Sequence, residues 1–487
     1  MTQKTKVKKS VKKPSRVKAA VEVLKLIMKH KKGLFGLTIL IVFVLIAVFA
    51  DVISPHSPDE LGLADRFAVP IWFKNFPQYK DLPENLAVRV GAEEWNLKNT
   101  VPSQIQFKKE SPGWLSFKVK PGEDVSQASV QLEYDFEYLY SPPKRFEGNI
   151  PYKVTINGEP GSYAKILFYI VTPKGKSYLI YDSRSIAYNK TMIDPPARFD
   201  ARDIALKLRL GFADYEDIGE KIFSEKGTYK LKLEVIIVSV PKSTITVDIG
   251  PLYFRIPGLA YGILGTDNLG ADLFANLIYG TRVSLLVGIL ASIISVSIGL
   301  VVGIVAGYKG GIVDQILTFF TDTLLFMPVI PLLIAVSVYI GKNLYLTISL
   351  IALLSWMGFA RNCRAFVMSL RERLFVEAAK AVGASDIYII FRHILPQLTP
   401  LIYITLVLNV PGAILLEASL SFLNLGDPSV PSWGRMLYNA RYSGAFFKLM
   451  WWWIIPPGIM ITLLAMSFIL IGQTLDEVFN PKLKARR

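Results

Sequence analysis

The sequence predicts a polytopic α-helical membrane protein with six transmembrane helices and a large β-rich, sandwich-like insert between the first and second of them. Uncharged apolar runs near the N-terminus and after residue 262 reach the roughly 20 residues that a helix needs to cross a bilayer core of about 30 Å. Residues 55–262 contain no run of this kind. Composition agrees with this fold class, because 52% of the 487 residues are hydrophobic.

The positive charge of the chain gathers at its two ends. The formal net charge is +16, and twelve Lys or Arg residues fall between Lys4 and Lys32, directly before the first apolar run. Four more, Lys482, Lys484, Arg486 and Arg487, close the chain. Because basic flanks stay in the cytoplasm, we expect residues 1–32 and 483–487 to be cytoplasmic tails of a multi-pass protein of the cell membrane. The N-terminal tail lacks interleaved aromatic residues, so no nucleic-acid partner is expected.

Residues 33–54 form the predicted first transmembrane helix, and the β-rich insert follows. The apolar run is longer than a signal-peptide core, which predicts a retained anchor. Residues 55–262 then lie outside the cell. Strands are predicted where β-branched and aromatic residues alternate with polar ones between Gly, Pro and Asn turns, at residues 126–132, 153–156, 164–171, 177–181, 228–238 and 244–249. Asn189, in Asn189-Lys190-Thr191, is a possible glycosylation site.

A second membrane block is predicted over residues 263–482. Residues 270–278 are expected to form an interfacial helix. Five further spans follow at about residues 283–307, 316–340, 344–360, 401–423 and 451–472, with residues 424–448 as an outer loop. Arg361, Arg364, Arg371 and Arg373 place the loop between spans four and five, about residues 362–399, in the cytoplasm.

This cytoplasmic loop is too charged to be a span, and its pattern predicts two short helices around Gly383. An alanine-rich stretch before Gly383 favours a slim helix. Ser385 is a candidate N-cap for the next helix, and Pro396 is expected to end it. Its apolar stripe is predicted to be Ile387, Ile390, Phe391, Ile394 and Leu395. We expect a compact knob that docks another protein.

Four motifs carry a family resemblance. Glu377-Ala378-Ala379, Gly383 and Ile394-Leu395-Pro396 resemble the EAA loop of ABC importer permeases. Three other stretches resemble the C-type permease subunit of the oligopeptide, dipeptide and nickel importers: Leu264-Gly265-Thr266-Asp267 with Leu269-Gly270 and Asp272, the run from Leu277 to Gly288, and Glu417-Ala418-Ser419-Leu420-Ser421-Phe422-Leu423 with Leu425-Gly426 and Ser432-Trp433-Gly434. The insert is not covered by this resemblance.

The resemblance implies a type I ABC importer permease fold with no catalytic residues, metal or cofactor of its own. ATP and Mg²⁺ would be bound by partner ATPases, and the chain lacks the phosphate-binding motif G-x-x-x-x-G-K-[ST]. The implied partners are a second homologous permease, two ATP-binding cassette subunits, an extracytoplasmic solute-binding protein and the lipid bilayer. The implied ATPase-docking coupling helix comprises Val376, Glu377, Ala378, Ala379, Lys380, Ala381, Gly383 and Ala384.

Residues of the translocation pathway are predicted from polar groups and prolines within the spans. A carboxylate at the centre of a span costs about 2.5–3.5 kcal/mol, so Asp322 should face a polar cavity, or a hydrogen-bonding helix interface. Relatives often carry arginine where this chain has Phe319, so that partner is missing. The candidates are Asp322, Met327, Pro328, Glu417, Ser421 and Trp433.

Taken together, these features predict a permease subunit of an ATP-driven, binding-protein-dependent importer that works by alternating access and is not itself an enzyme. Oligopeptides or dipeptides are the expected substrates, with oligosaccharides or nickel as an alternative. A membrane-anchored extracellular ligand receptor is a second alternative, but it would need a larger cytoplasmic output domain. We hypothesise that the insert contacts the binding protein.

Overall fold

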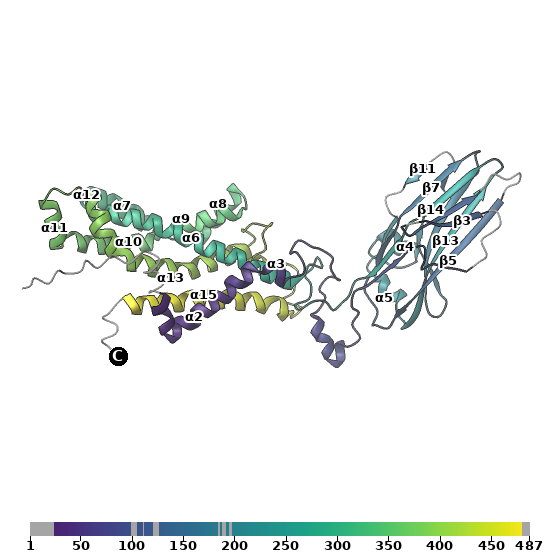
Figure 1. Ribbon diagram of the computed structural model, residues 1–487, viewed down its shortest axis with the longest axis horizontal. Coiled ribbons are helices and arrows are strands. Elements are labelled where there is room, and N and C mark those ends of the chain that lie inside the picture. Colours follow the sequence, from purple (N-terminus) through teal and green to yellow (C-terminus); the bar gives the residue numbers. More distant parts are fainter. Residues whose placement is uncertain are drawn as a thin grey trace, which may run out of the picture. The chain divides into compact units, whose positions relative to one another are not determined.

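The structure is a computed structural model that describes residues 24–98, 105–110, 112–119, 126–183, 186–187, 191–193 and 197–479. The chain divides into two compact units, which we treat separately: unit 1 comprises Met1–Pro58 and Leu273–Arg487, and unit 2 comprises Asp59–Asp272. Figure 1 labels their helices and strands. Asn189 and the basic residues 1–23 and 483–487 lie outside the described residues.

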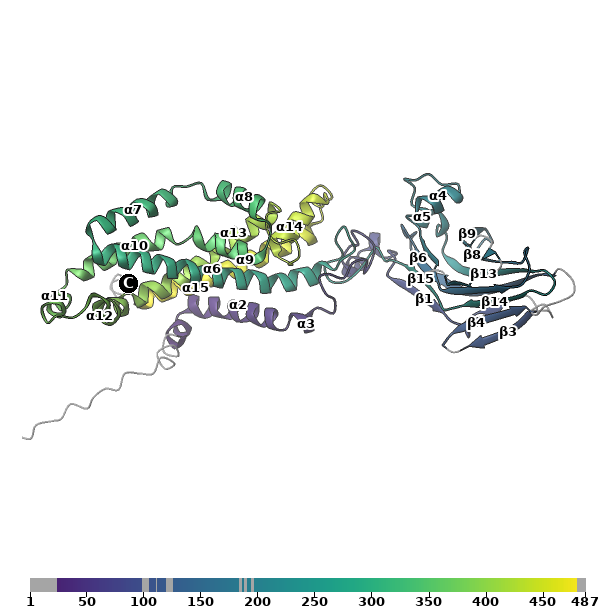
Figure 2. The same cartoon turned by 90° about the horizontal axis from the view of Figure 1, so that it is seen from above.

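Unit 1 is helical, and its long helices run side by side (Figures 1 and 2). Within the described residues, five helical stretches are long and apolar enough to cross a membrane, or six if one bent pair counts as a span. The elements are α2 (Lys31–Val48), α3 (Ala50–Ile53), α6 (Leu273–Lys309), α7 (Gly311–Leu325), α8 (Val329–Ile340), α9 (Leu344–Leu353), α10 (Met357–Arg371), α11 (Leu374–Ala381), α12 (Asp386–Ile389), a π-helical turn (Ile390–Ile394), α13 (Leu395–Phe422), α14 (Trp433–Tyr442) and α15 (Trp451–Phe479).

The predicted third span is broken into α7 and α8, which meet at 84°. The break falls just before Pro328, whose backbone (φ −68°, ψ 100°) is extended rather than helical. Pro331 lies in the first turn of α8, where a missing N–H removes no helical hydrogen bond. The two prolines therefore start a new helix in a new direction instead of kinking one span.

Two further predictions for unit 1 were wrong in detail. Residues 270–278 do not form a separate interfacial helix, because α6 runs unbroken from Leu273 to Lys309. Gly280 does not interrupt it, since that glycine is packed against Trp433. The loop after α13 contains the helix α14, which begins at Trp433 with Ser432 as its N-cap.

Helix α6 is the centre of unit 1 and contacts α2, α7, α9, α10, α13 and α14. Glycines let its neighbours approach closely. A Cβ atom at Gly303 would lie 2.7 Å from Cβ of Cys363 on α10, so only glycine allows this approach. Cys363 is fully buried there.

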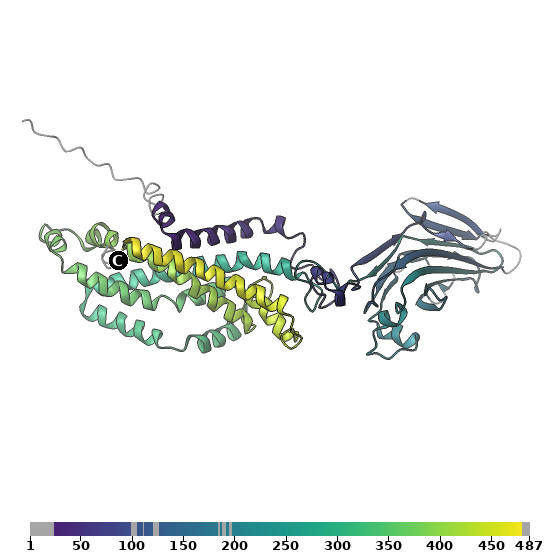
Figure 3. The same ribbon diagram turned by 90° about the horizontal axis from the view of Figure 1, so that it is seen from below.

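Unit 2 contains antiparallel sheets stacked in layers (Figure 3). Among the described residues the sheet orders are β1-β15-β6-β12, β10-β8-β13-β5-β2 with β9 beside β8, and β11-β7-β14-β4-β3. The strands are β1 (Leu86–Val90), β2 (Asn96–Leu97), β3 (Ile105–Glu110), β4 (Trp114–Val119), β5 (Ser126–Tyr138), β6 (Glu147–Ile150), β7 (Tyr152–Asn157), β8 (Tyr163–Val171), β9 (Ser177–Asp182), β10 (Ile186–Ala187), β11 (Thr191–Ile193), β12 (Ala197–Asp200), β13 (Gly227–Ser239), β14 (Thr244–Ile249) and β15 (Leu252–Ile256).

The predicted β-rich insert is confirmed as a β-rich region, and all six predicted strand segments are strands. The three sheets share one apolar core, to which Phe146, Tyr229 and Phe254 contribute fully buried rings. Short helical turns η1 (Ile71–Asn75), η2 (Pro77–Tyr79), α4 (Ile204–Arg209) and α5 (Ile218–Ile222) complete the unit. No strand was predicted at β1 or β15, which pair with each other in the structure.

The two ends of unit 2 are tied together by a ladder that we call the clasp, formed by residues 62–71 and 258–271. The backbone N–H of Leu63 donates to the carbonyl of Gly270 at 2.9 Å, and that of Phe67 to the carbonyl of Asp267 at 3.0 Å. The Thr266 hydroxyl donates to the carbonyl of Asp65 at 2.6 Å. Burial raises the pKa of the Asp267 carboxyl, although backbone N–H donors, foremost that of Ala271, oppose the shift.

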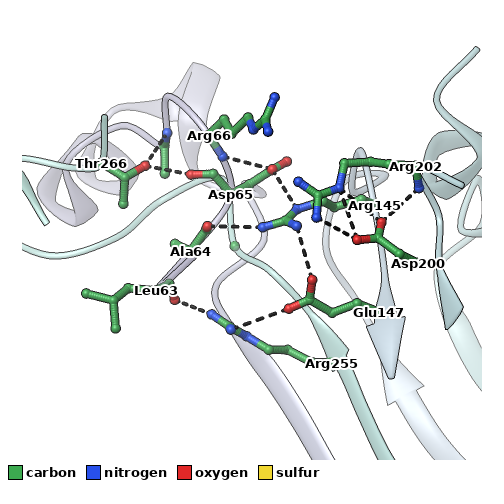
Figure 4. Close-up of polar contacts among 12 residues, drawn as sticks. Leu63, Ala64, Asp65, Arg66, Arg145, Glu147, Asp200, Arg202, Arg255 and Thr266 are labelled. Carbon is green, nitrogen blue, oxygen red and sulfur yellow. Dashed lines mark hydrogen bonds and ion pairs between the residues drawn. The ribbon is translucent and has the colours of Figure 1, made fainter. Parts of the chain in front are cut away.

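A buried ion pair locks the clasp to the strands (Figure 4). The Nε of Arg145 lies 3.0 Å from Oδ1 of Asp65, and the side chains are only 7% and 5% exposed. Arg145 also contacts Glu147 at 3.1 Å. Removing either partner would leave the other as an uncompensated buried charge, so a single substitution at this pair should destabilise unit 2 strongly. The motif at residues 264–267 is thus part of the clasp, which joins the chain segments before and after the strands.

Candidate functional site

The predicted knob is present at one end of the helical bundle, where α10 leads into α11 and α12 (Figure 2). Gly383 makes the turn between the two short helices with φ +80°, a conformation that glycine adopts without cost. Ser385 caps α12 by accepting a hydrogen bond from the backbone N–H of Tyr388, as predicted. We call residues 372–394 the knob.

A few buried contacts anchor the knob to the long helices. Val376, Ile389 and Ile394 are fully buried in a cluster with residues of α6, α10 and α13. The Tyr308 hydroxyl, at the end of α6, donates to Oδ1 of Asp386 at 2.8 Å. The Lys380 ammonium lies 5.3 Å from the centre of the same tyrosine ring. The end of α6 therefore holds both halves of the knob.

The rest of the knob is exposed. Five large hydrophobic side chains are more than half exposed: Leu374 (82%), Val382 (84%), Ile387 (70%), Phe391 (66%) and Tyr388 (53%). Of the predicted coupling residues, Val376 is buried, Ala379 and Ala384 are half-buried, and Glu377, Ala378, Lys380, Ala381 and Gly383 are exposed. An exposed apolar surface around small residues is typical of a protein interface.

The predicted apolar stripe of the second knob helix was partly wrong. Ile394 is buried, but Ile387 and Phe391 point outwards, and the buried positions are Ile389, Ile394 and Leu398. The π-helical turn between residues 390 and 394 adds one residue per turn, which changes the spacing from four to five. Pro396 does not end the helix either, because it lies in the first turn of α13.

A second group of motif residues lies near the opposite end of the bundle (Figure 2), and we call it the Trp433 cluster. Trp433 is fully buried, and its Nε1 donates to the carbonyl of Leu277 on α6 at 2.9 Å. A Cβ atom at Gly280 would lie 2.7 Å from its ring. The ring of Phe43 on α2 meets it edge-on at 6.0 Å. One indole thus joins α2, α6 and α14.

Glu417 and Ser421 on α13 extend this cluster. The Ser421 hydroxyl donates to Oε1 of Glu417 at 2.7 Å, and the two residues are 5% and 2% exposed, respectively. Gly426 and Gly434 pack against Ser421 so closely that added Cβ atoms would lie 2.1 Å from its Oγ and 2.8 Å from its Cβ. The motif glycines therefore make room for a buried polar pair.

Beside the Trp433 cluster, Arg282 ties α6 to the end of α2. Its Nη2 lies 2.9 Å from Oδ2 of Asp51, and its Nε donates to the carbonyl of Ala47 at 2.6 Å. The Tyr279 hydroxyl donates to the same carboxylate at 2.7 Å. A guanidinium at a helix C-terminus satisfies carbonyls that lack helical partners.

Asp322 has an ionic partner that the sequence did not reveal. Its Oδ1 lies 2.5 Å from Nη2 of Arg361 on α10, and both residues line a cavity of about 230 Å³ between α6, α7 and α10. Met327 and Pro328 are exposed at the break between α7 and α8. Asp322 therefore borders a cavity and also forms an ion pair across the α7–α10 interface, so both expected settings are met at once. Arg361 rather than residue 319 supplies the opposite charge.

Comparisons with known proteins identify the family. Residues 299–485 match the family described as binding-protein-dependent transport system inner membrane component, and residues 21–70 match the N-terminal transmembrane domain of oligopeptide transport permease C. A peptide permease protein of Brucella suis is 38% identical over 220 residues, which are 45% of this chain and 72% of that protein. The dipeptide transport system permease protein DppC of Alkalihalophilus pseudofirmus is 37% identical over 222 residues, again 45% and 72%.

The chain belongs to this family of ABC transporter permeases. It is a multi-pass membrane protein of the peptide-transport type, and permeases of this kind are not themselves enzymes. The solved MetNI methionine ABC transporter overlaps 41% of this chain and 96% of its own at 18% identity, with a TM-score of 0.33. The mannan-binding module TmCBM27 overlaps 36% and 99% at 16% identity, with a TM-score of 0.21. Both scores are too low to support an argument.

Three residues of the permease were missed from sequence. In the sequence, Tyr308 stands at the end of an apolar run, which does not suggest a functional role. A tyrosine beside Lys309 could nevertheless have indicated a polar contact of its hydroxyl. Asp314 and Arg361 read only as charges at span ends. The signal that could have found them is the alternation of acids on one helix with arginines on another, which predicts pairing once the helices are known to be adjacent.

Proposed function

We propose that the permease is one of two non-identical membrane subunits of an ATP-driven, binding-protein-dependent importer of oligopeptides or dipeptides. The observation that carries this proposal is the knob, a motif-bearing surface that is anchored to α6 and exposes large apolar side chains. The substrate class is supported by the relatives named peptide and dipeptide permeases. Oligosaccharides and nickel remain the alternative cargo, and no observation favours the receptor alternative.

The knob is the proposed docking site for one of two ATPase subunits, which bind ATP and Mg²⁺. Glu377, Ala378, Ala381 and Gly383 would face the ATPase, with Val376 as the anchor beneath them. Because the knob is continuous with α10 and α13 and hydrogen-bonded to α6, movement of the ATPases would be passed to these three helices. That movement would open the pathway alternately to the two sides of the membrane.

For the pathway itself, the structure favours residues near the α7–α8 break over those of the Trp433 cluster. Asp322, Met327 and Pro328 lie at a cavity or at an exposed break, where a solute could pass. Glu417, Ser421 and Trp433 are buried between helices of the same chain, so a pathway role for them stays a prediction.

The proposed orientation places the knob and both termini in the cytoplasm and unit 2 outside. Cys363 is buried and cannot report on this. In a Cys363→Ala background, we expect Val382→Cys on the knob to react with a membrane-impermeant maleimide only in inside-out vesicles. Tyr215→Cys in unit 2, which is equally exposed (85% against 84%), should react in intact cells. The reverse pattern would contradict the orientation.

Co-purification with the ATPases tests the docking proposal. Glu377→Lys should abolish co-purification, whereas the matched charge reversal Glu137→Lys, on an exposed position of unit 2, should not. Gly383→Pro should also abolish it, because proline cannot adopt φ +80°. Gly383→Asn should retain it, since asparagine tolerates that conformation. Intact binding and coupling in Glu377→Lys and Gly383→Pro would refute the proposal.

A further inference from the structure

Two ion pairs join α7 to α10, and they differ in how completely they are satisfied. Arg364 holds Asp314 with both Nε and Nη2, the latter 2.6 Å from Oδ2, and the hydroxyl of Thr318 donates to the same carboxylate at 3.2 Å. Arg361 touches Asp322 with Nη2 alone, at 2.5 Å. In the part of the chain that the structure describes, Nε and Nη1 of Arg361 have no acceptor.

Exposure separates the pairs in the same way. The Arg364 and Asp314 side chains are 29% and 12% exposed, whereas those of Arg361 and Asp322 are 46% and 37% exposed. The first pair is a closed structural contact between two helices. The second pair leaves the Nε and Nη1 donors of Arg361 open to its surroundings.

The open pair borders the 230 Å³ cavity, whose lining combines small residues and the apolar Val302 and Leu317 with polar residues. The small residues Gly303 and Ala306 of α6 and Ala360 of α10 provide the space of the cavity. The polar atoms come from Thr318, Thr321 and Asp322 of α7 and from the arginines of α10. The Thr321 hydroxyl donates to the carbonyl of Leu317 at 2.7 Å, so its oxygen can still accept.

We infer that Arg361 binds the C-terminal carboxylate of the transported peptide, an inference that rests on the proposed function. A guanidinium presents a planar fork of donors that matches a carboxylate, and such charge-assisted bonds are stronger than neutral ones. Asp322 holds one edge of the guanidinium in place and leaves the other edge free for the substrate. Asp322 is thus a positioning residue, and Arg361 is the group that touches the peptide.

The test uses the assembled importer in lipid vesicles, with its binding protein and ATPases. Uptake of a mixed tripeptide library with free C-termini is compared with uptake of the same library as C-terminal amides. The binding protein is identical for all variants, so its own preference cancels between wild type and variant. Arg361→Gln should lower uptake of the free acids roughly 10- to 100-fold and leave uptake of the amides unchanged. Uptake of the free acids by Arg361→Lys should lie between the uptake by the wild type and that by Arg361→Gln.

Arg364→Gln, the same substitution on the same helix, is the matched control. It should lower the yield of assembled complex without changing the ratio of free-acid to amide uptake. Equal losses of both peptide forms in Arg361→Gln, or no loss of either, would overturn the inference while leaving peptide import intact. A lower yield of complex with an unchanged ratio would mean that Arg361 contacts the second permease instead, and would also overturn it. If the wild-type importer takes up neither form, the proposed function fails, and this inference fails with it.

Discussion

The knob and the Trp433 cluster are both built from motif residues of one permease family, but most of these residues are exposed in the knob and buried in the cluster. In the cluster, Trp433, Glu417 and Ser421 are buried, and each makes a hydrogen bond within the chain. In the knob, Glu377 and Gly383 are exposed, and large apolar side chains surround them. The comparison supports the proposal that one motif serves the packing of this subunit and that the other forms a docking surface for a different chain. Mutations should therefore separate stability from assembly.

The largest effect on stability is expected from Trp433→Ala. Removing this fully buried indole takes away the contact to Gly280 and the hydrogen bond to the carbonyl of Leu277, and should cost about 3–5 kcal/mol. Thermal unfolding of the purified permease in detergent measures it. Trp451→Ala removes the same residue type at a position that is 47% exposed, and should shift the transition much less. Equal shifts would mean that the cluster is not a packing centre.

An intermediate effect on local stability is expected at the contact that anchors the knob to α6. Tyr308→Phe removes the hydrogen bond to Asp386 and should cost about 0.5–1.5 kcal/mol locally. Hydrogen exchange of residues 374–391 should become faster while that of α15 does not change. Tyr388→Phe, on a half-exposed ring of the knob itself, should leave exchange unaffected. Unchanged exchange in Tyr308→Phe would remove α6 from the coupling route.

A small effect on stability but a large one on assembly is expected on the exposed face of the knob. Leu374→Ser and Val382→Ser change side chains that are 82% and 84% exposed, so the unfolding transition should move by less than about 0.5 kcal/mol. Binding of the ATPases, measured by co-purification, should weaken. Leu208→Ser, at an exposed position of unit 2 (65%), should affect neither. Full ATPase binding by both knob variants would place the interface elsewhere.

The smallest effect on the helical unit is expected from removing the strands of unit 2. The chain enters and leaves them side by side, since β1 pairs with β15 from Leu86 opposite Ile256, and the N–H of Ile71 donates to the carbonyl of Gly262 at 2.9 Å. Replacing residues 72–257 with a short Gly-Ser linker should preserve folding and ATPase binding.

The same deletion tests whether the insert contacts the binding protein. Affinity of the binding protein for the assembled importer, measured on vesicles, should fall when residues 72–257 are replaced. An unchanged affinity would refute that hypothesis and leave the strands as a passive elaboration of the permease.

Local signals predicted much of this structure. The turn at Gly383, the cap at Ser385 and the strands flanked by Gly, Pro and Asn turns depend on neighbours in the chain, and they were found. The π-helical turn was not, because one extra residue per turn changes which apolar side chains face inwards without changing composition. The sequence analysis also divided α6 into an interfacial helix and a span, whereas the structure has one unbroken helix from Leu273 to Lys309.

The sequence by itself determined the apolar character of the long helices, the β-rich insert, the family and the position of the knob, because each is encoded in contiguous composition or in a motif. Only the tertiary structure decided which partner satisfies each charge and which motif residues are buried. Arg361 and Asp322 are 39 residues apart and Trp433 and Leu277 are 156 apart. Such contacts depend on how helices pack, and packing is fixed by side-chain shape in three dimensions rather than by any local pattern.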